Sequence, residues 1–453
     1  MLVRDDTIAA IASAPGRGAV ALVRLSGAAA DAIAGRVCSP WPPAPRVATR
    51  VTVRDPERGL VIDEALATRY PAPRSYTGET VVELSTHGGA YVPAAVLAAV
   101  VAAGAREAAP GEFSERAVYH GKFDLVRAEA IADLVDARSR AQHRAAMQQL
   151  AGTLSRQYAA LRDAVLHVDA LLAYDIDFPE EDDGALPRAR IDMACAGVIG
   201  QLDALLATLP AAQLGRDGAT VVLAGPPNAG KSSLLNALVG EARVIVSDTP
   251  GTTRDAVEVL LEADPWPLRF VDTAGLRNDA DPIERLGIEV SERYLARAHA
   301  VVACAETPAA MTQALAAIGA LTGAPVIGAL TKSDLVTNRT YIDTPAAPII
   351  RVSARDGTGL PELVAAVVAA IAAGLPSPGD DVPIVTRARH RAALSRARDE
   401  MQAFRDAWGA GALPAPVAAV HVRTAAHALD ELIGAVDVEE VFARVFSTFC
   451  VGK

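Results

Sequence analysis

The fold is decided by the stretch TVVLAGPPNAGKSSLLNALVG, residues 220–240. It opens with β-branched and aliphatic residues, passes through a turn rich in Gly and Pro, and ends in a helix-forming segment. Its centre, GPPNAGKSS (225–233), fits the pattern G-x-x-x-x-G-K-[ST]. Because the strand before it and the helix after it are both present, we expect a phosphate-binding P-loop rather than a chance Gly-rich turn.

Each residue type in this loop suits phosphate chemistry. Backbone amides at a helix N-terminus can face phosphate oxygens. The Lys231 ammonium would neutralise the β- and γ-phosphates, and the Ser232 hydroxyl would bind Mg²⁺. The predicted contacts with the nucleotide in this loop are Asn228, Ala229, Gly230, Lys231, Ser232 and Ser233.

Four motifs downstream predict a guanine nucleotide. In GTTRD (251–255), Thr253 would complete the Mg²⁺ coordination. In DTAG (272–275), Asp272 would hold Mg²⁺ through water, and the Gly275 amide would sense the γ-phosphate. In TKSD (331–334), Asp334 can accept from N1 and the exocyclic amine of guanine, and SAR (353–355) would meet the guanine carbonyl. The further predicted contacts are Ser247, Asp248, Thr249, Pro250, Gly251, Thr252, Thr253, Asp272, Thr273, Ala274, Gly275, Lys332, Asp334, Ser353, Ala354 and Arg355.

One position departs from the guanine pattern. The motif is usually Asn-Lys-x-Asp, and Thr331 stands in the Asn place. Threonine is shorter and cannot donate as an amide does. We therefore expect weaker affinity for the base, or a weaker tie between this loop and the P-loop.

The residues that would catalyse hydrolysis are harder to identify from the sequence. Leu276 follows DTAG where a water-orienting Gln would stand in some GTPases, yet positive charge is still needed between the β- and γ-phosphates. A K⁺ ion could supply it, held by the Asn228 amide and the hydroxyls and carbonyls of SDTPG (247–251), although Asn228 could equally be a loop spacer. Glu284 could orient water, or could be a glutamate favoured at a helix N-terminus.

Composition and patterning predict several domains. The chain has 453 residues, which suggests about three domains. We expect α+β structure over 1–119, long helices over 120–215, a doubly wound α/β domain over 216–375 and helices again over 376–453. The predicted fold class is therefore multidomain α+β and α/β, with a Ras-like P-loop G domain inserted into a discontinuous helical domain.

Charge and hydropathy limit the partners and the compartment. The net charge is −11, so a contact with RNA must be a local basic patch. The run 386–398 is one candidate, but could equally be a solvated helix face. Asp5 and Asp6 do not suit a signal peptide, and the apolar runs 90–105 and 363–375 are shorter than a membrane span. The cysteines share no metal-ligand spacing or disulfide framework, so we expect a cytoplasmic protein without a membrane segment.

The chain resembles the tRNA-modification GTPase family MnmE over essentially its whole length. Beyond the P-loop, the resemblance rests on DTIAAIASAPGRGAVALVRLSG (6–27), SYTGETVVELSTHGG (75–89), PGEFSERAVYHGKFDLVRAEAIADLVDA (110–137) and the terminal CVGK (450–453). It implies GTP hydrolysis stimulated by K⁺ and by pairing of G domains. Glu284, twelve residues after Asp272, matches the glutamate that orients the attacking water. The implied ligands are Asn228, Ser247, Thr249 and Thr252 for K⁺, and Ser232 and Thr253 for Mg²⁺.

The resemblance also implies a folate site in the first domain. Members dimerise through that domain and bind formyl-tetrahydrofolate, and Arg24, Glu83, Lys122 and Lys453 match the folate contacts. Arg and Lys can pair with carboxylates, while Glu can accept from the donor edge of a pterin. Taken alone, Arg24 and Glu83 would read as solvated strand residues. Cys450 would act in the one-carbon chemistry, or serve only as a structural end.

The implied activity is addition of an aminomethyl or carboxymethylaminomethyl group to carbon 5 of the wobble uridine of certain tRNAs. The family works with a flavoprotein partner, MnmG, in a complex of the heterotetramer type. Thr249-Pro250 stands where members often have Ile-Ala, which puts the stiffness of that loop in doubt. Two other classes share a G domain. A regulatory or ribosome-assembly GTPase usually lacks SYTGE and CVGK, and no lipid anchor or basic amphipathic helix supports a membrane-remodelling GTPase.

Overall fold

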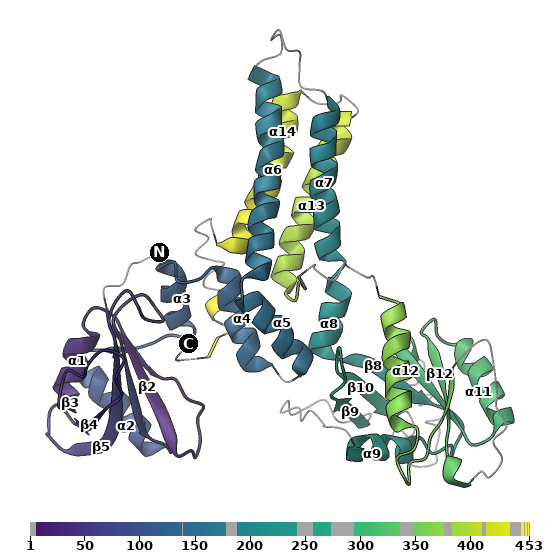
Figure 1. Ribbon diagram of the computed structural model, residues 1–453, viewed down its shortest axis with the longest axis horizontal. Helices are drawn as coiled ribbons and strands as arrows, with labels where there is room; N and C mark the ends of the chain where they lie inside the picture. The colour runs from purple at the N-terminus through teal and green to yellow at the C-terminus, as the bar shows by residue number, and fades with distance from the viewer. Residues whose placement is uncertain are drawn as a thin grey trace, which may run out of the picture. The chain divides into compact units, whose positions relative to one another are not determined.

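The computed structural model shows two compact units, each built from segments far apart in the sequence (Figure 1). One comprises Met1–Val135, Gln149–Val198 and Arg396–Lys453, and the other comprises Asp136–Gln148 and Ile199–Ser395. The boundaries predicted for the three domains, with the helical domain in two segments, remain a prediction. The structure describes residues 6–137, 139–177, 188–241, 257–272, 294–335, 348–375, 383–409, 414–434, 445–447, 449–450 and 452.

The first unit contains a seven-stranded sheet with the order β3-β4-β5-β6-β2-β1-β7. Neighbouring strands are antiparallel, except that β1 and β7 run parallel. Helices α1 (Ala30–Val37) and α2 (Tyr91–Ala102) pack on one face and enclose an aliphatic core. The strands are β1 (Ile8–Ile11), β2 (Val20–Ser26), β3 (Cys38–Ser39), β4 (Thr49–Arg54), β5 (Val61–Tyr70), β6 (Val81–His87) and β7 (Arg106–Glu107).

Strand alternation places Arg24 of β2 and Glu83 of β6 on the face of this sheet away from that core. Val23 and Leu25 of β2 point into the core because successive side chains alternate between faces. Arg24 between them therefore lies on the opposite face. The antiparallel register sets Arg24 directly across from Glu83 of β6.

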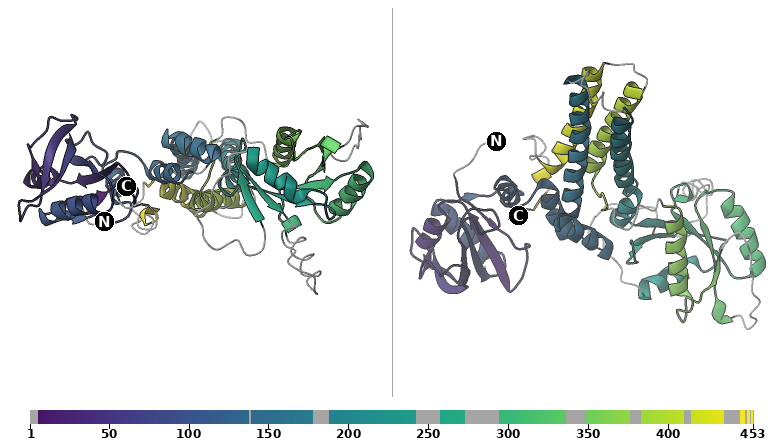
Figure 2. Two further views of the ribbon diagram at one scale, coloured as in Figure 1. Left: turned by 90° about the horizontal axis from the view of Figure 1, so that it is seen from below. Right: turned by 45° about the horizontal axis from the view of Figure 1, so that its top comes forward.

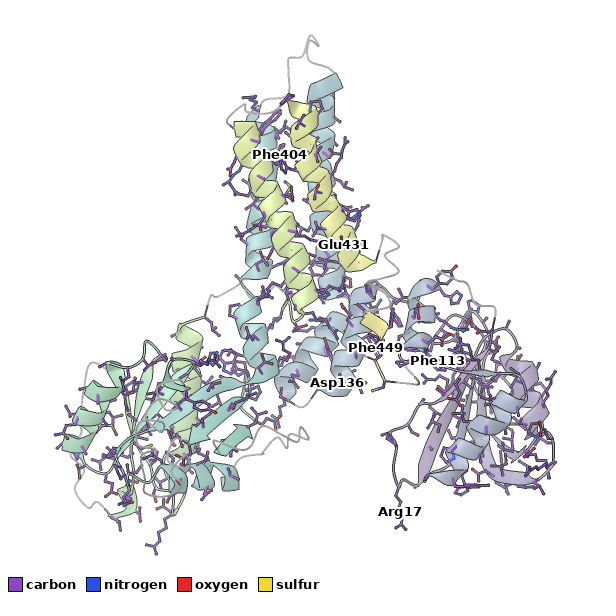
Figure 3. All side chains as sticks on the ribbon, turned by 180° about the vertical axis from the view of Figure 1, so that it is seen from behind. Arg17, Phe113, Asp136, Phe404, Glu431 and Phe449 are labelled. Carbon is purple, nitrogen blue, oxygen red and sulfur yellow. The ribbon has the colours of Figure 1, made fainter. Side chains whose placement is uncertain are left out.

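Four long helices, which lie wholly or partly in the first unit, run side by side (Figures 1 and 2). α6 (Thr153–Asp177) packs along α14 (Ala415–Ile433), and α7 (Arg188–Leu206) contacts α13 (Ala388–Gly409) where the Cys195 thiol meets the Met401 carbonyl at 3.5 Å. Phe404 of α13 is buried among these helices (Figure 3). Two helices precede the nucleotide motifs and two follow them, as expected for a discontinuous helical domain. The shorter helices nearby are α3 (Glu112–Tyr119) and α4 (Leu125–Asp136).

One stretch of the described chain, Arg188–Asp217, is long and apolar enough to cross a membrane by length and composition alone. It differs from the two apolar runs noted in the sequence, 90–105 and 363–375. Its buried residues recur at helical spacing, at Ile191, Cys195, Val198 and Leu202. Charged residues lie on the remaining surface, for example at Asp192. A single buried stripe of this kind is typical of a core helix in a globular protein.

The second unit is built on a six-stranded sheet with the order β13-β12-β11-β8-β10-β9, parallel except for the β9–β10 pair. Apolar clusters cover both faces, which confirms the predicted doubly wound α/β class. The strands are β8 (Ala219–Ala224), β9 (Val257–Leu261), β10 (Leu268–Asp272), β11 (Ala300–Ala305), β12 (Val326–Leu330) and β13 (Ile349–Arg351). The helices are α5 (Arg140–Leu150), α8 (Leu209–Asp217), α9 (Lys231–Glu241), α11 (Pro308–Gly319) and α12 (Leu360–Ala373), with the 3₁₀ turn η2 (Ser333–Leu335).

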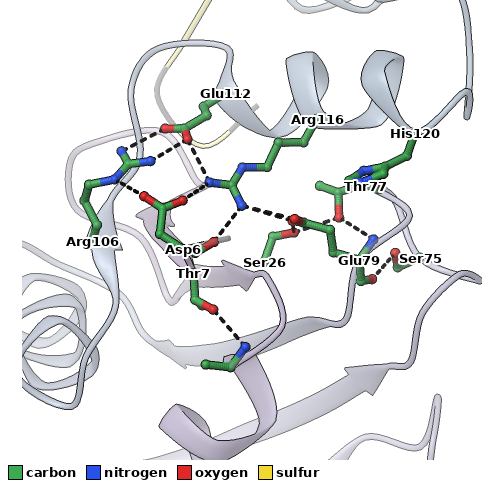
Figure 4. A network of polar contacts seen from close by, with 11 residues as sticks. Asp6, Thr7, Ser26, Ser75, Thr77, Glu79, Arg106, Glu112, Arg116 and His120 are labelled. Atoms are coloured by element: carbon green, nitrogen blue, oxygen red, sulfur yellow. Dashed lines mark hydrogen bonds and ion pairs between the residues drawn. The ribbon is translucent and has the colours of Figure 1, made fainter. Parts of the chain in front are cut away.

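An ionic network fixes α3 against the sheet of the first unit (Figure 4). Arg116 donates to Asp6 at 2.6 Å, to Glu112 at 3.0 Å and to Glu79 at 3.2 Å. Arg106 contacts the same Asp6 at 2.8 Å and the same Glu112 at 2.6 Å. Because Glu112 and Arg116 are buried, removing one of them would leave the other buried charge with fewer opposite charges around it.

We expect Glu112→Gln to weaken α3 in a pH-dependent way. Burial alone raises the pKa of Glu112, but hydrogen bonds from Arg106, the Ala109 amide and Arg116 outweigh it and hold the pKa below its usual value. A lowered pKa stabilises the fold above the unfolded pKa, and that stability is lost as pH falls through the folded pKa. Hydrogen exchange of α3 amides should show opening easier by about 3 kcal/mol at neutral pH.

The matched control is Glu107→Gln, because Glu107 is exposed on β7. Its α3 amides should exchange as in the unmodified protein. The difference caused by Glu112→Gln should shrink as pH falls through the lowered pKa of folded Glu112, where the wild-type carboxyl gains its proton. A loss of protection independent of pH would contradict an ionic role for Glu112.

Candidate functional site

The P-loop joins β8 to α9 and needs a backbone without side chains at two points. Gly225 has φ +150°, and a Cβ there would lie 2.2 Å from the Cys304 carbonyl oxygen. Gly230 has φ +81°. Asn228 is also left-handed, with φ +60°, and is exposed on the loop. Asn tolerates this conformation better than most residues, so the sequence of the loop matches its geometry.

The structure brings together the side chains predicted to meet phosphate and Mg²⁺. The Lys231 ammonium donates to the carbonyls of Gly225 and Pro226, each at 2.9 Å, and the residue is 7% exposed. The Ser232 hydroxyl donates to the Asp272 carboxylate at 2.6 Å. This contact forms because β8 and β10 are neighbouring parallel strands that end at the same edge of the sheet. A hydroxyl beside a carboxylate is an oxygen donor set that suits Mg²⁺.

The guanine loop follows β12 at the same edge. Thr331 is 4% exposed, and its hydroxyl donates to the Ala229 carbonyl of the P-loop at 2.9 Å. The tie that we expected to be weakened by threonine is therefore made. Lys332 is left-handed, with φ +55°, and its ammonium pairs with Glu306. Sequence reasoning missed Glu306, although it directly follows the buried strand β11 and so lies at the edge where the other motifs lie.

The Asp334 carboxylate is held from the next loop. The buried Ser353 hydroxyl donates to Asp334 at 3.2 Å. Ser353 in turn accepts from the Arg355 amide at 3.3 Å. The predicted TKSD and SAR motifs thus meet, and Asp334 remains exposed where a base could bind. The following predicted site residues lie outside the described part of the chain: Ser247, Asp248, Thr249, Pro250, Gly251, Thr252, Thr253, Thr273, Ala274, Gly275, Glu284 and Lys453.

A second cluster lies in the first unit, around Arg24. The Arg24 guanidinium contacts Glu83 through Nε at 2.9 Å and through Nη2 at 2.8 Å. It also lies 5.4 Å from the Tyr76 ring centroid and 5.7 Å from that of Phe113. Its Nη1 donates to the Gly452 carbonyl at 3.3 Å. Three distant parts of the chain therefore converge on one guanidinium.

The other predicted members of this cluster are less tightly joined. The Lys122 ammonium donates to the Pro73 carbonyl at 3.0 Å, at the start of the loop that carries Tyr76. Tyr76 was not a predicted site residue, although it lies in the quoted SYTGE motif. Its hydroxyl shares a 2.8 Å hydrogen bond with Ser114 of α3. The α3 network thus supports the ring that lies against Arg24.

The C-terminal tail docks on this part of the unit. Phe449 and Phe446 pack against Leu125 and the N-terminus of α3, near Phe113 (Figure 3). The Gly111 amide donates to the Cys450 carbonyl at 3.4 Å.

The tail carries the exposed thiol of the chain. All four cysteines are described, and Cys450 alone is exposed. Burial raises the pKa of Cys38 to about 12, of Cys195 to about 11 and of Cys304 to about 12. A thiol with a raised pKa is a poor nucleophile at neutral pH. Cys450 is therefore the cysteine available for chemistry.

Two family models and a solved structure are similar to parts of this chain. The family model described as the MnmE helical domain matches residues 125–450, and that described as the GTP-binding protein TrmE N-terminus matches residues 7–122. Over 34% of its length the chain is also similar to the G domain of the T. maritima FeoB iron transporter, covering 98% of that chain with 26% identity and a TM-score of 0.26.

Curated relatives match from end to end. The tRNA modification GTPase MnmE of Azoarcus sp. is 41% identical over 454 residues, which is 99% of this chain and 98% of that protein. Its counterpart in Methylobacterium radiotolerans is 42% identical over 455 residues, covering 99% of each chain. That of Moorella thermoacetica is 38% identical over 463 residues, covering 99% of this chain and all of that one. Because relatives 38–42% identical cover 99% of this chain, and both family models match it, the chain belongs to the family of tRNA modification GTPases MnmE.

Proposed function

We propose that the chain couples K⁺-activated hydrolysis of GTP to modification of carbon 5 of the wobble uridine in certain tRNAs. GTP hydrolysis and action on tRNA follow from the family. The observation that carries the proposed mechanism is the hydrogen bond of Ser232 to the buried Asp272 carboxylate, beside the buried Lys231. A cation, a hydroxyl and a carboxylate there can receive the phosphates and Mg²⁺ of a bound nucleotide.

Several residues of the G domain have a proposed role in hydrolysis. Lys231 neutralises the β- and γ-phosphates, Ser232 and Thr253 hold Mg²⁺, and Asp272 orients a water of that ion. Mg²⁺ and K⁺ would supply positive charge at the phosphates as the bond to the γ-phosphate breaks. Glu284 orients the attacking water. Asn228, Ser247, Thr249 and Thr252 hold K⁺, and the exposure of Asn228 on the P-loop supports this for the described member of the set.

For the first unit we propose a formyl-tetrahydrofolate site made by Arg24, Glu83, Lys122 and Lys453. A cation and an acceptor side by side, next to the Tyr76 ring, fit a planar ligand that carries both donor groups and carboxylates. Because Arg24 and Glu83 pair with each other, the ligand must share or open that pair. The folate would supply the one-carbon unit, and these residues bind and orient it.

We further propose that Cys450 attacks the uridine ring from the docked tail. Its exposed thiol belongs to a segment whose backbone contacts both Arg24 and Gly111. Thiols add readily to electron-poor rings, so the residue type suits the reaction. The docking would keep the thiol near the one-carbon donor.

The proposed assembly is a cytoplasmic homodimer joined through the N-terminal domains, with a flavoprotein partner of the MnmG kind. The partner would supply the flavin chemistry that the modification needs. A regulatory or ribosome-assembly switch shares only the G domain with this design. The match to the TrmE N-terminus at residues 7–122, which lies outside the G domain, and the match to the MnmE helical domain at 125–450 favour the modifying enzyme.

We expect K⁺ to accelerate GTP turnover on the order of tenfold or more over Na⁺ at matched ionic strength, because it adds a fixed positive charge beside the reacting bond. Glu284→Ala should lower turnover in K⁺ by about 10²–10³-fold without loss of GTP binding. Glu362→Ala is the matched control, since Glu362 is exposed on α12 of the same unit. Equal turnover in the two salts would show that the Asn228 loop holds no K⁺ and that an arginine or a partner supplies the charge.

A further inference from the structure

Thr331 joins three loops at the edge of the second unit's sheet where the predicted nucleotide motifs lie, here called the nucleotide edge. Its amide donates to the Ala305 carbonyl at 2.8 Å, which continues the sheet beyond β12. Its hydroxyl lies 2.9 Å from the Ala229 carbonyl and 3.2 Å from the Ala305 carbonyl. Gly230 approaches closely, since a Cβ there would lie 3.5 Å from the Thr331 Cβ. The hydroxyl is thus enclosed between the P-loop and the end of β11.

The number of protons on this hydroxyl determines whether Thr331 can donate to the base. A hydroxyl has one proton to donate, and both of its neighbours here are carbonyl oxygens, which only accept. The proton of Thr331 is therefore used inside the protein. Guanine N7 is also an acceptor, so Thr331 has nothing to offer it. An asparagine amide at this position would carry two protons, enough for the Ala229 carbonyl and for N7 together.

The other predicted base contacts are held without Thr331. Ser353 holds the Asp334 carboxylate at 3.2 Å, and Glu306 holds the Lys332 ammonium. Asp334 can accept from N1 and from the exocyclic amine, both on the edge of guanine away from N7. Recognition of guanine can thus proceed although N7 receives no hydrogen bond from this position.

We infer that Thr331 fastens the guanine loop to the P-loop and does not read the base, so that the chain accepts guanine nucleotides altered at N7. This rests on the proposed guanine contacts of Asp334 and of Ser353–Arg355. Threonine preserves the fastening function of the usual asparagine and gives up its second donor. The consequence is a nucleotide specificity that differs from that of a G domain with Asn in the motif.

The test compares the dissociation constants of GDP and 7-deaza-GDP, in which carbon replaces N7. The unmodified protein should bind the two within about twofold, because no protein hydrogen bond from Thr331 is lost. Thr331→Asn should bind GDP about three- to tenfold more tightly than 7-deaza-GDP, the value of one hydrogen bond. Tenfold preference for GDP in the unmodified protein, or no preference in Thr331→Asn, would overturn the inference.

Two further variants separate fastening from base reading. Thr331→Val keeps the shape but leaves the Ala229 carbonyl without its donor, and should weaken binding of both nucleotides equally. Thr331→Ser keeps the hydroxyl and should bind both nucleotides as tightly as the unmodified protein does. If Thr331→Val changed the ratio of the two dissociation constants, the hydroxyl would be shown to contact N7, against the inference.

Asp334→Asn distinguishes failure of the inference from failure of the proposed guanine site. Xanthine presents a carbonyl where guanine has its amine, so the variant should prefer xanthosine diphosphate to GDP. If Asp334→Asn does not prefer xanthosine diphosphate, Asp334 does not bind guanine as proposed, and the inference about Thr331 is wrong as well. With the switch present, a preference of the unmodified protein for GDP over 7-deaza-GDP overturns the inference alone.

Discussion

Replacing Lys231 with alanine is expected to lower GTP turnover by about 10²–10³-fold, the usual loss when one preorganised charged donor is removed from a phosphate site. Lys231 is 7% exposed, and its ammonium donates to the Gly225 and Pro226 carbonyls, inside the loop that would surround the phosphates. Phosphate oxygens would replace those neutral acceptors with stronger, charge-assisted ones. Single-turnover hydrolysis and GTP affinity, measured in K⁺ with Mg²⁺, would report the loss.

Two variants make the Lys231 result specific. Arg297→Ala removes an exposed cation from the same unit and should leave turnover unchanged. Lys231→Arg keeps the charge but is bulkier and planar, and the enclosed position leaves little space for it, so it should not restore turnover. Turnover of Lys231→Ala within about threefold of the unmodified protein would show that the P-loop lysine does not meet the phosphates.

The nucleotide edge could be predicted from the sequence because its residues follow consecutive strands of a parallel sheet. Ser232 and Asp272 are far apart in the chain, yet the parallel pairing of β8 and β10 brings them to 2.6 Å. A motif after each strand is therefore enough to predict that such residues meet. The same reasoning extends to Asp334 after β12, which Ser353 contacts from beyond β13.

Thr331 shows what residue types alone do not determine. A hydroxyl is shorter than an amide, which predicts a weaker tie to the P-loop. The tie forms because the Thr331 amide donates to the Ala305 carbonyl, which holds the loop where the hydroxyl reaches the Ala229 carbonyl. Such a distance depends on packing of the whole sheet edge.

The N-terminal cluster was harder to predict for a related reason. Strand alternation predicts the face on which Arg24 lies, but the antiparallel register decides that Glu83 is its partner. The contact of Arg24 with Gly452 joins positions near opposite ends of the chain, and no local pattern encodes it. For this cluster the quoted family motifs, rather than periodicity, carried the prediction.

The second large effect is expected at the tail, from Gly452→Val. Gly452 has φ +97°, and a Cβ there would lie 2.7 Å from the Ile11 carbonyl oxygen and 2.8 Å from the Ala12 Cα. These are backbone atoms that cannot move aside cheaply, so a side chain must lift the tail and break its contact with Arg24. If Cys450 acts from the docked tail, tRNA modification should fall by about 10²-fold or more. Modification assayed with the flavoprotein partner and formyl-tetrahydrofolate would measure this.

The matched control is Gly59→Val, because Gly59 also has a left-handed φ, +69°, but a Cβ there meets nothing within 4 Å. It carries the backbone strain without the collision, and should keep most of the modification activity. GTP turnover should survive in both variants, since the tail and the P-loop belong to different units. Cys450→Ala should lose as much modification activity as Gly452→Val. The double variant should lose no more than either single variant, because the effects of groups that act as a unit do not add. Full modification by Gly452→Val would instead mean that docking is not needed, and full modification by Cys450→Ala would mean that Cys450 is only a structural end.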